Sequence, residues 1–304
     1  YVYRIEGLDQ LKDDSKVEPI NAGDIRDRFE EVSALEDGDG KATNGAMINA
    51  RLQEDQKLLS DILSGQGYFD SQVRGSLQLP GQDSQAPITV LLDVTPGPRY
   101  ILGAIKFDAP PVIPDDLITS AFLPKPGEPI VADRILAAEA SIAVELPQNG
   151  YPFVKIGDRD ILLDAPTRTG DYTLPVTPGP RSSFGDIETG GPEMVAGYDP
   201  KHLGKIARFK KGELYDSRKM DDFRKALVAT GLFSTVGVEP QPSGQPAGDG
   251  TDYATIQVKQ EAGPARTLAG QGGYATGQGL KVDGTWTHRN MFPPEGALIG
   301  QATL

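Results

Sequence analysis

The hexapeptide Val94-Thr95-Pro96-Gly97-Pro98-Arg99 occurs twice in this chain, and its second copy is Val176-Thr177-Pro178-Gly179-Pro180-Arg181. A diverged third copy is Gly263-Pro264-Ala265-Arg266. A second phrase keeps the same spacing at three places, which are Gly67-Tyr68-Phe69, Gly150-Tyr151-Pro152-Phe153 and Gly231-Leu232-Phe233. Two markers that recur together predict a module of about 80 residues that is repeated three times and ends each time at a Gly-Pro turn.

The composition argues against several classes of protein. The 304 residues carry a net charge of −13, and phosphate backbones and anionic lipid headgroups repel so acidic a surface. Cysteine is absent, which excludes disulfides, thiol nucleophiles and zinc sites built on cysteine. The chain has no apolar run of about 18 residues, so we expect no membrane-spanning helix.

Hydrophobic periodicity predicts the element order strand, helix, helix, strand, strand in every copy. In the first copy the strands are expected at 2–6, 68–79 and 88–94, and the helices at 21–35 and 46–64, with Val32 on the apolar face of the first helix. In the second copy the strands are expected at 99–108, 153–163 and 171–176, and the helices at 114–123 and 131–146. In the third copy the strands are expected at 183–189, 234–240 and 253–258, the helices at 200–208 and 217–229, and a hairpin loop at 241–252. We therefore divide the chain into modules at 1–97, 98–179 and 180–262 and a tail at 263–304.

This element order predicts an α+β module in which two helices cover one face of a three-stranded mixed sheet. The last two strands form an antiparallel hairpin, and the first strand joins through a helical crossover. A three-stranded sheet leaves two edges with unpaired N–H and C=O groups, which is the physical property that we expect to matter for function. The junctions Pro96-Gly97-Pro98 and Pro178-Gly179-Pro180 are predicted to be stiff hinges, because proline restricts the backbone; ordinary turns are the alternative.

The tail has a different periodicity, with apolar and polar residues alternating in short strands and no helix between them. Leu280, Val282, Gly284 and Trp286 alternate with polar residues, and Gly277-Gln278-Gly279 is expected to turn the chain before them. Such alternation is typical of transmembrane β-strands and equally of a small water-soluble β-meander, and the tail alone does not decide between them.

Tandem modules of this kind, followed directly by alternating strands, resemble the outer-membrane assembly-factor superfamily, whose periplasmic modules are called POTRA domains. The segments Gly231–Val236, Gly273–Gly277 and Trp286–Phe292 look like the last POTRA module and the first strands of a β-barrel. Three modules are most similar to the TamA type, the translocation and assembly module subunit, rather than to the BamA type with five modules, although a truncated BamA-like chain would also show three. The chain departs from the family pattern at Pro293-Pro294-Glu295-Gly296, so that turn is expected to differ.

The resemblance implies an outer-membrane protein with its POTRA modules in the periplasm, without enzymatic activity or cofactor. The implied partners are unfolded outer-membrane protein or autotransporter segments, an inner-membrane-anchored partner of the TamB type, and outer-membrane lipid around the barrel; nucleic acid is not among them. Partner strands would add to the second strand of each module by main-chain hydrogen bonds. The candidate contact residues on these strands are Phe69, Val73, Leu77, Phe153, Val154, Ile156, Val236 and Val238. The alternative is a soluble periplasmic adaptor that uses POTRA-like modules without a complete barrel.

Three other motifs are weaker signals. Gly270-x-Gly272-x-x-Ala275 matches a dinucleotide fingerprint but is not followed by a predicted helix, and Asp37-Gly38-Asp39-Gly40-Lys41 places lysine where a calcium loop needs an oxygen ligand. The only histidines, His202 and His288, have no partners in the sequence that predict a triad or a metal site. We therefore expect no catalytic, metal or cofactor site.

Overall fold

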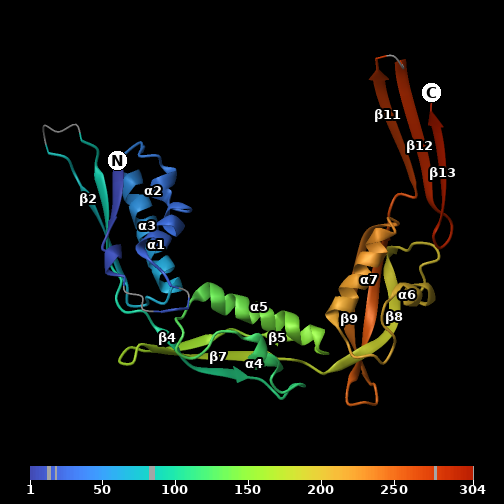
Figure 1. The fold of residues 1–304 in the computed structure, drawn as a ribbon, viewed down its shortest axis with the longest axis horizontal. Coiled ribbons are helices and arrows are strands. Elements are labelled where there is room, and N and C mark those ends of the chain that lie inside the picture. The colour runs from blue at the N-terminus through green and yellow to red at the C-terminus, as the bar shows by residue number, and fades with distance from the viewer. Residues whose placement is uncertain (12–14, 18, 82–85, 277–278, 304) are drawn as a thin grey trace. The chain divides into compact units, whose positions relative to one another are not determined.

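The computed structural model describes residues 1–11, 15–17, 19–81, 86–276 and 279–303. The predicted turns at 80–87 and 277–279 lie partly outside these residues. The chain forms two compact units, of which the first comprises residues 1–109, 118–142 and 156–176 and the second residues 110–117, 143–155 and 177–304. We call residues 1–97, 98–179 and 180–262 repeats 1, 2 and 3 and describe them in this order (Figure 1).

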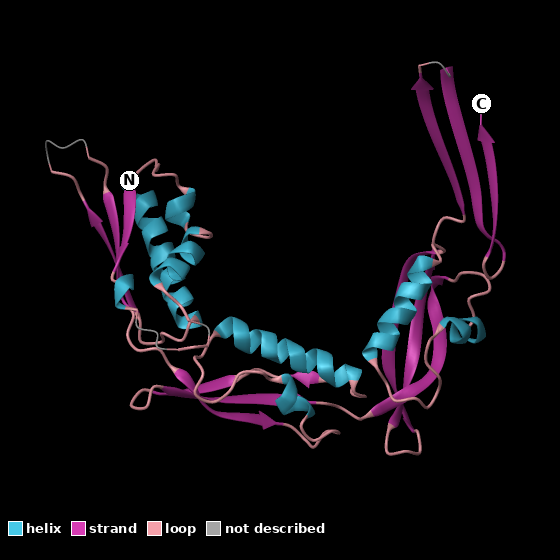
Figure 2. Cartoon of the chain, viewed as in Figure 1, coloured by secondary structure: helices cyan, strands magenta, loops and turns pink. Residues whose placement is uncertain are grey.

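Repeat 1 is a three-stranded sheet with its helices on one face (Figure 2). Its elements are β1 (Val2–Glu6), the 3-10 helix η1 (Leu8–Gln10), α1 (Ala22–Glu30), α2 (Ala34–Asp37), α3 (Gly45–Gly65), β2 (Gln72–Gln78) and β3 (Thr89–Thr95). The central strand is β3, which pairs in parallel with β1 and antiparallel with β2. Repeat 1 is therefore an α+β module with a mixed sheet, and its last two strands pair antiparallel, as predicted.

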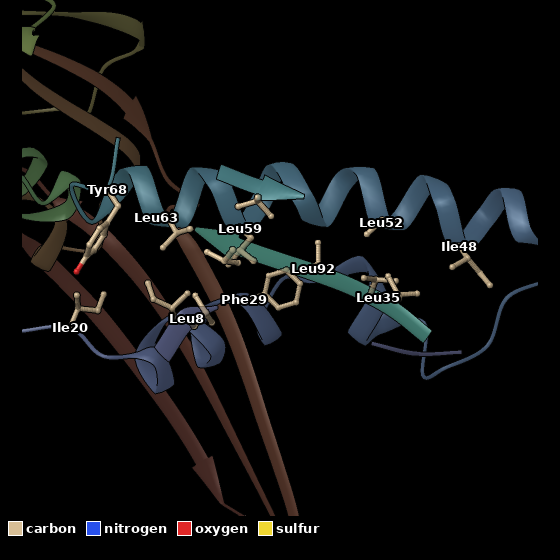
Figure 3. Close-up of a cluster of buried hydrophobic side chains, with 14 residues drawn as sticks. Leu8, Ile20, Phe29, Leu35, Ile48, Leu52, Leu59, Leu63, Tyr68 and Leu92 are labelled. Carbon is tan, nitrogen blue, oxygen red and sulfur yellow. The ribbon is translucent and has the colours of Figure 1, made fainter. Parts of the chain in front are cut away.

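The core of repeat 1 forms where the apolar faces of helices and sheet meet. Val90, Leu92 and Val94 alternate along β3 and are fully or almost fully buried, as the alternation in the sequence predicts. Figure 3 shows side chains from α1, α3 and β3 in this cluster, among them Phe29 and Leu59.

Two predictions for repeat 1 are wrong in detail. The first helix was expected to run through residue 35, but α1 ends at Glu30 and a separate turn, α2, begins after Ser33, whose side chain accepts a hydrogen bond from the Glu36 amide. This break leaves Val32 68% exposed, not on the apolar face. Strand β2 is also shorter than the predicted 68–79, and Leu79 beyond its end is 74% exposed.

Repeat 2 has the sheet order β4-β7-β5, and β6 also pairs with β7. Its elements are β4 (Ile101–Asp108), α4 (Leu117–Ala121), α5 (Ala132–Gln148), β5 (Lys155–Ile156), β6 (Asp160–Asp164) and β7 (Thr169–Thr177). The single strand predicted at 153–163 is wrong, because the chain leaves the strand between β5 and β6. There the Gly157 amide donates to the Pro175 carbonyl at 2.8 Å.

Repeat 3 has the sheet order β8-β10-β9, with β8 parallel and β9 antiparallel to the central strand. Its elements are β8 (Ser182–Glu193), α6 (Pro200–Ile206), α7 (Ser217–Ala229), β9 (Phe233–Pro246) and β10 (Asp252–Ala262). Helix α7 has the predicted bounds, and Met220, Phe223 and Leu227 on its apolar face are buried. The loop predicted at 241–252 is wrong in its first half, because β9 continues to Pro246.

The tail forms a separate antiparallel sheet of β11 (Arg266–Ala275), β12 (Gly279–Phe292) and β13 (Gly296–Thr303). Several of its apolar side chains face solvent, and Leu268 is 82% exposed. The predicted succession of strands without helices is confirmed. Among the described residues, no helix combines the length and the apolar character needed to cross a membrane.

Candidate functional site: the strand edges

The first strand of repeat 3 is covered along its outer edge by the segment between the two helices of that repeat. The Phe184 amide donates to the Glu213 carbonyl at 2.8 Å, and the Gly212 amide donates to the Phe184 carbonyl at 2.8 Å. One step further, the Tyr215 amide donates to the Ser182 carbonyl at 3.0 Å. These bonds occupy the groups that an incoming strand would need, so this part of β8 is closed to partners.

Repeat 2 closes its first strand in the same way. The Leu102 amide donates to the Glu128 carbonyl at 2.7 Å, and the Gly127 amide donates to the Leu102 carbonyl at 2.7 Å. The Ile130 amide also donates to the Tyr100 carbonyl at 3.1 Å. The pattern of the three bonds is the one found on β8, so the covering segment is part of the repeated design.

A further repeated motif, which was not among the predicted ones, marks both covering segments. It is Lys125-Pro126-Gly127-Glu128 in repeat 2 and Lys210-Lys211-Gly212-Glu213 in repeat 3. In repeat 3, Glu213 also accepts a hydrogen bond from Lys219, and this bond holds the pKa of the Glu213 carboxyl below its ordinary value. The repetition of this Lys-x-Gly-Glu motif is visible in the sequence. The role of the motif is not, because it depends on contacts with a strand that is distant along the chain.

We expect Gly212→Ala to destabilise repeat 3 by about 1 kcal/mol, because Gly212 has a φ of 88° that side chains rarely adopt. The matched control is Gly204→Ala in the exposed part of α6, which should stabilise the same repeat by about 0.5–1 kcal/mol because alanine is the better helix former. Hydrogen exchange of repeat 3 amides measures both changes. Equal effects of the two substitutions would contradict this account of the covering segment.

The second strands lie at the opposite edges of the sheets, where the sequence analysis placed partner binding. Val73 and Leu77 lie on β2, Ile156 lies on β5, and Val236 and Val238 lie on β9. No described strand pairs with the outer side of β2 or of β9. The residues on β2 and β9 therefore lie on strands at the border of their sheets, and the role of all five residues in binding stays a prediction.

Three of the predicted edge residues are not on strands. Phe69 precedes β2 and lies against Tyr100, with 5.5 Å between ring centroids. Phe153 and Val154 precede β5, and Phe153 contacts the core of repeat 3. These three residues lie before the strands on which they were expected, so their role in partner binding stays a prediction.

The two Pro-Gly-Pro junctions share one local geometry. Gly97 and Gly179 have φ values of 72° and 74°. The Tyr100 amide donates to the Gly67 carbonyl at 2.9 Å, and the Ser182 amide donates to the Gly150 carbonyl at 2.7 Å. The two repeated phrases thus meet at each junction, and the hinge role of Pro96, Pro98, Pro178 and Pro180 stays a prediction.

On β2, a helix side chain occupies part of the outer edge. The Gln56 amide on α3 donates to the Val73 carbonyl at 2.9 Å. A groove of about 490 Å³ lies beside this contact, and its lining consists of Gln53, Gln56, Lys57, Ser60 and Val73. The side-chain amide imitates a backbone N–H, so a partner strand would have to displace it at this point.

The corresponding edge of repeat 2 is interrupted. Arg159, between β5 and β6, forms an ion pair with Glu139 on α5, and Tyr172 on β7 donates to the same carboxylate at 2.7 Å. Burial and then this hydrogen bond raise the pKa of Tyr172. The chain leaves the strand at this ion pair, so repeat 2 presents two short pieces of edge.

The acidic residues and histidines were considered as possible metal ligands in the part of the chain that is described. No group of three or more His, Asp or Glu side chains there has the arrangement of a metal site. His202 lies 3.1 Å from a Glu295 carboxylate oxygen, in the turn between β12 and β13, and His288 lies on β12.

The sequence of the chain is similar to that of a curated outer-membrane protein assembly factor. No protein-family model matches the chain. The outer membrane protein assembly factor BamA of Nitratidesulfovibrio vulgaris Hildenborough is 24% identical over 293 residues, which are 95% of this chain and 34% of that protein. The chain therefore spans about a third of the length of this curated relative.

Two solved structures of BamA proteins were compared with the chain. BamA of Haemophilus ducreyi lacking POTRA domains 1–3 has a TM-score of 0.53 at 18% identity, covering 67% of this chain and 37% of that chain. POTRA domains 3–5 of Haemophilus influenzae BamA have a TM-score of 0.46 at 19% identity, covering 86% and 94%. The first of these shows the fold alone, and the sequence comparison shows similarity to a BamA protein.

Proposed function

We propose that this chain is the periplasmic POTRA region, with the first barrel strands, of an outer-membrane protein that assembles other outer-membrane proteins. The observation that carries the proposal is the similarity to BamA along 95% of the chain. In this proposal the modules lie in the periplasm, at residues 1–97, 98–179 and 180–262, and residues 263–304 enter the outer membrane. The partners are unfolded outer-membrane protein or autotransporter segments, and lipid surrounds the completed barrel.

The mechanism needs no bond chemistry, because strand assembly is an exchange of hydrogen-bond partners. A segment in extended conformation gains main-chain hydrogen bonds from a sheet edge, and such bonds demand little of its sequence. The edges of β2 and β9 are available for this exchange, whereas β4 and β8 are partly covered. We propose that the second strands hold partner segments, and that the protein acts as a binding scaffold without catalysis.

Within the superfamily, the three repeats favour a TamA-type protein with a TamB-type partner anchored in the inner membrane, whereas the similarity to BamA favours a BamA-type protein. The number of POTRA modules in the full-length protein distinguishes the two, since the TamA type has three and the BamA type five. A BamA-type protein would make the TamB-type partner unnecessary.

Depletion of the full-length protein in its own cells tests the function. We expect the amount of folded outer-membrane proteins, measured by their heat-modifiable migration on gels, to fall as the protein is depleted. A copy of the gene without the segment for residues 1–262 should fail to restore them. Unchanged levels after depletion, or recovery of the full-length protein in the soluble fraction, would contradict the proposal and favour a soluble adaptor.

A further inference from the structure

The outer edge of β9 presents the main chain of every second residue. In an antiparallel pair, residues alternate between those that bond to the neighbouring strand and those whose N–H and C=O groups point away from it. The Tyr253 carbonyl of β10 faces β9, because it accepts a hydrogen bond from Ser243 Oγ at 2.6 Å. The next residue, Ala254, faces the other way, since a β-carbon built on Gly185 of β8 would lie 2.9 Å from its carbonyl oxygen.

The register transfers this alternation to β9. The pairing of β10 with β9 is continuous from Ala254 to Gln260. In this stretch every second residue of β10 lies opposite one of four β9 residues: Ala254 opposite Pro242, Ile256 opposite Pro240, Val258 opposite Val238, and Gln260 opposite Val236. The Gln260 carbonyl also faces β8, because a β-carbon on Gly191 would collide with it. The four residues of β9 that present their main chain to the free edge are therefore Val236, Val238, Pro240 and Pro242.

Two of these four positions are prolines, which have no N–H. At these positions proline costs the sheet no hydrogen bond, because the missing donor would have pointed outward. It does remove the donor that a partner strand would need, and proline is one of the means by which proteins protect sheet edges. Only Val236 and Val238 retain both the donor and the acceptor, so the open edge is confined to the first half of β9.

In the described part of the chain, no helix side chain caps this half of β9 in the way that Gln56 caps β2. Gln56, Glu139 and Met220 stand at the same distance before the repeated glycines Gly67, Gly150 and Gly231. The first donates to the edge of β2 and the second pairs with Arg159, but Met220 has no donor and is 6% exposed in the core. Among the described backbone groups, none forms a hydrogen bond with the outward main chain of Val236 or Val238.

We infer that an extended partner segment docks on residues 235–238 of β9, and that Pro240 and Pro242 limit the length of the added strand. The side chains of Val236 and Val238 are half-buried and contact the core of repeat 3. Apolar side chains at every second position of the partner would extend this apolar face, so the occupant is a segment with the alternation of an outer-membrane β-strand. The inference rests on the proposed function, which already assigns partner segments to the second strands, and adds that Pro240 and Pro242 restrict the contact to the first half of β9.

Substitutions of proline and alanine at one position separate the main chain from the side chain. The probe is a fluorescein-labelled peptide of about ten residues with alternating valine and threonine, the length of a transmembrane strand, and fluorescence anisotropy measures its affinity for the 1–304 chain. Val238→Pro removes the outward N–H and should raise Kd about tenfold, because one main-chain hydrogen bond is lost. Val238→Ala keeps the N–H and should change Kd by less than about threefold.

Pro240→Val tests the same edge without removing anything from the fold. It supplies an outward N–H beside Val238 and should lower Kd about threefold to tenfold. Hydrogen exchange gives a second measurement. The peptide should slow the exchange of the Val236 and Val238 amides. The amides of Gly237 and Glu239 face β10, so their exchange should already be slow without peptide.

The possible outcomes separate the inference from the proposed function. One outcome is that the peptide binds, that Val238→Pro and Val238→Ala bind it with equal affinity, and that Pro240→Val has no effect. The peptide then uses another edge, so the inference fails while the proposed function stands. If the peptide does not bind the unmodified chain, the inference fails together with strand addition. Protection of Val236 and Val238 by self-association without peptide would identify a second copy of the chain as the occupant and would also overturn the inference.

Discussion

Replacing Asp55 with alanine should lower the free energy of unfolding of repeat 1 by about 3–5 kcal/mol. Asp55 lies on α3 and is fully buried. Its carboxylate caps the N-terminus of the short helix α2, which lies about twenty residues earlier in the sequence. It accepts hydrogen bonds from the Ser33 hydroxyl at 2.6 Å, the Ala34 amide at 2.8 Å and the Leu35 amide at 2.9 Å. Alanine leaves these three donors without an acceptor, and each buried unpaired donor costs about 1–3 kcal/mol.

Asp61→Ala is the matched control, because Asp61 lies on the same helix and is exposed. It should change the stability by less than about 0.5 kcal/mol. Asp55→Asn keeps the shape and one carbonyl acceptor, so its cost should fall between those of the two alanine variants. Hydrogen exchange of the repeat 1 amides measures all three variants, and a cost of Asp55→Ala within about 0.5 kcal/mol of the control would show that the carboxylate does not hold α2.

Leu227→Ala should destabilise repeat 3 by about 2–5 kcal/mol, the range for buried leucines in well-packed cores. Leu227 is fully buried on α7, in the cluster that includes Phe223 and Val258. The truncation removes apolar contacts and leaves a cavity that the surrounding side chains fill only in part. Because no residue of this cluster is shared with the cluster of repeat 1, exchange of the repeat 1 amides should stay unchanged.

The control for Leu227→Ala is its neighbour Val228, which is 57% exposed on the same helix. Val228→Ala should change the stability by less than about 0.5 kcal/mol. A loss of only a few tenths of a kcal/mol in Leu227→Ala would mean that the apolar face of α7 is assigned wrongly. Slower or faster exchange in repeat 1 would mean that the repeats do not have separate cores.

The periodic segments were predictable because their signal is local. Helix α7 has its predicted bounds, since Met220, Phe223 and Leu227 recur at helical spacing and Asp216 accepts a hydrogen bond from the Arg218 amide at its start. Asp55 was missed, although a charged residue inside the apolar stripe of α3 is itself a signal. What the sequence does not show is its acceptor role, because the donors come from a turn about twenty residues earlier.

The strands at the edges were predicted less well because their limits depend on long-range contacts. At the break between β5 and β6, Arg159 forms an ion pair with Glu139, while the Gly157 amide still bonds to Pro175 of β7. The extension of β9 to Pro246 was missed because prolines are typical of loops. The sheet tolerates the prolines because the main-chain groups at their positions point away from β10. The direction of these groups depends on the strand register, which composition alone does not show.

The amino-acid sequence by itself determined the threefold repeat, the order of its helices and strands and most of the apolar faces, because these follow from spacing along a few turns or strands. Only the tertiary structure decided which edges are open. The Gly212 amide closes β8, Gln56 caps β2, and the first half of β9 stays free. An edge is open or closed according to what lies beside it in space, and the covering groups come from segments that are distant along the chain.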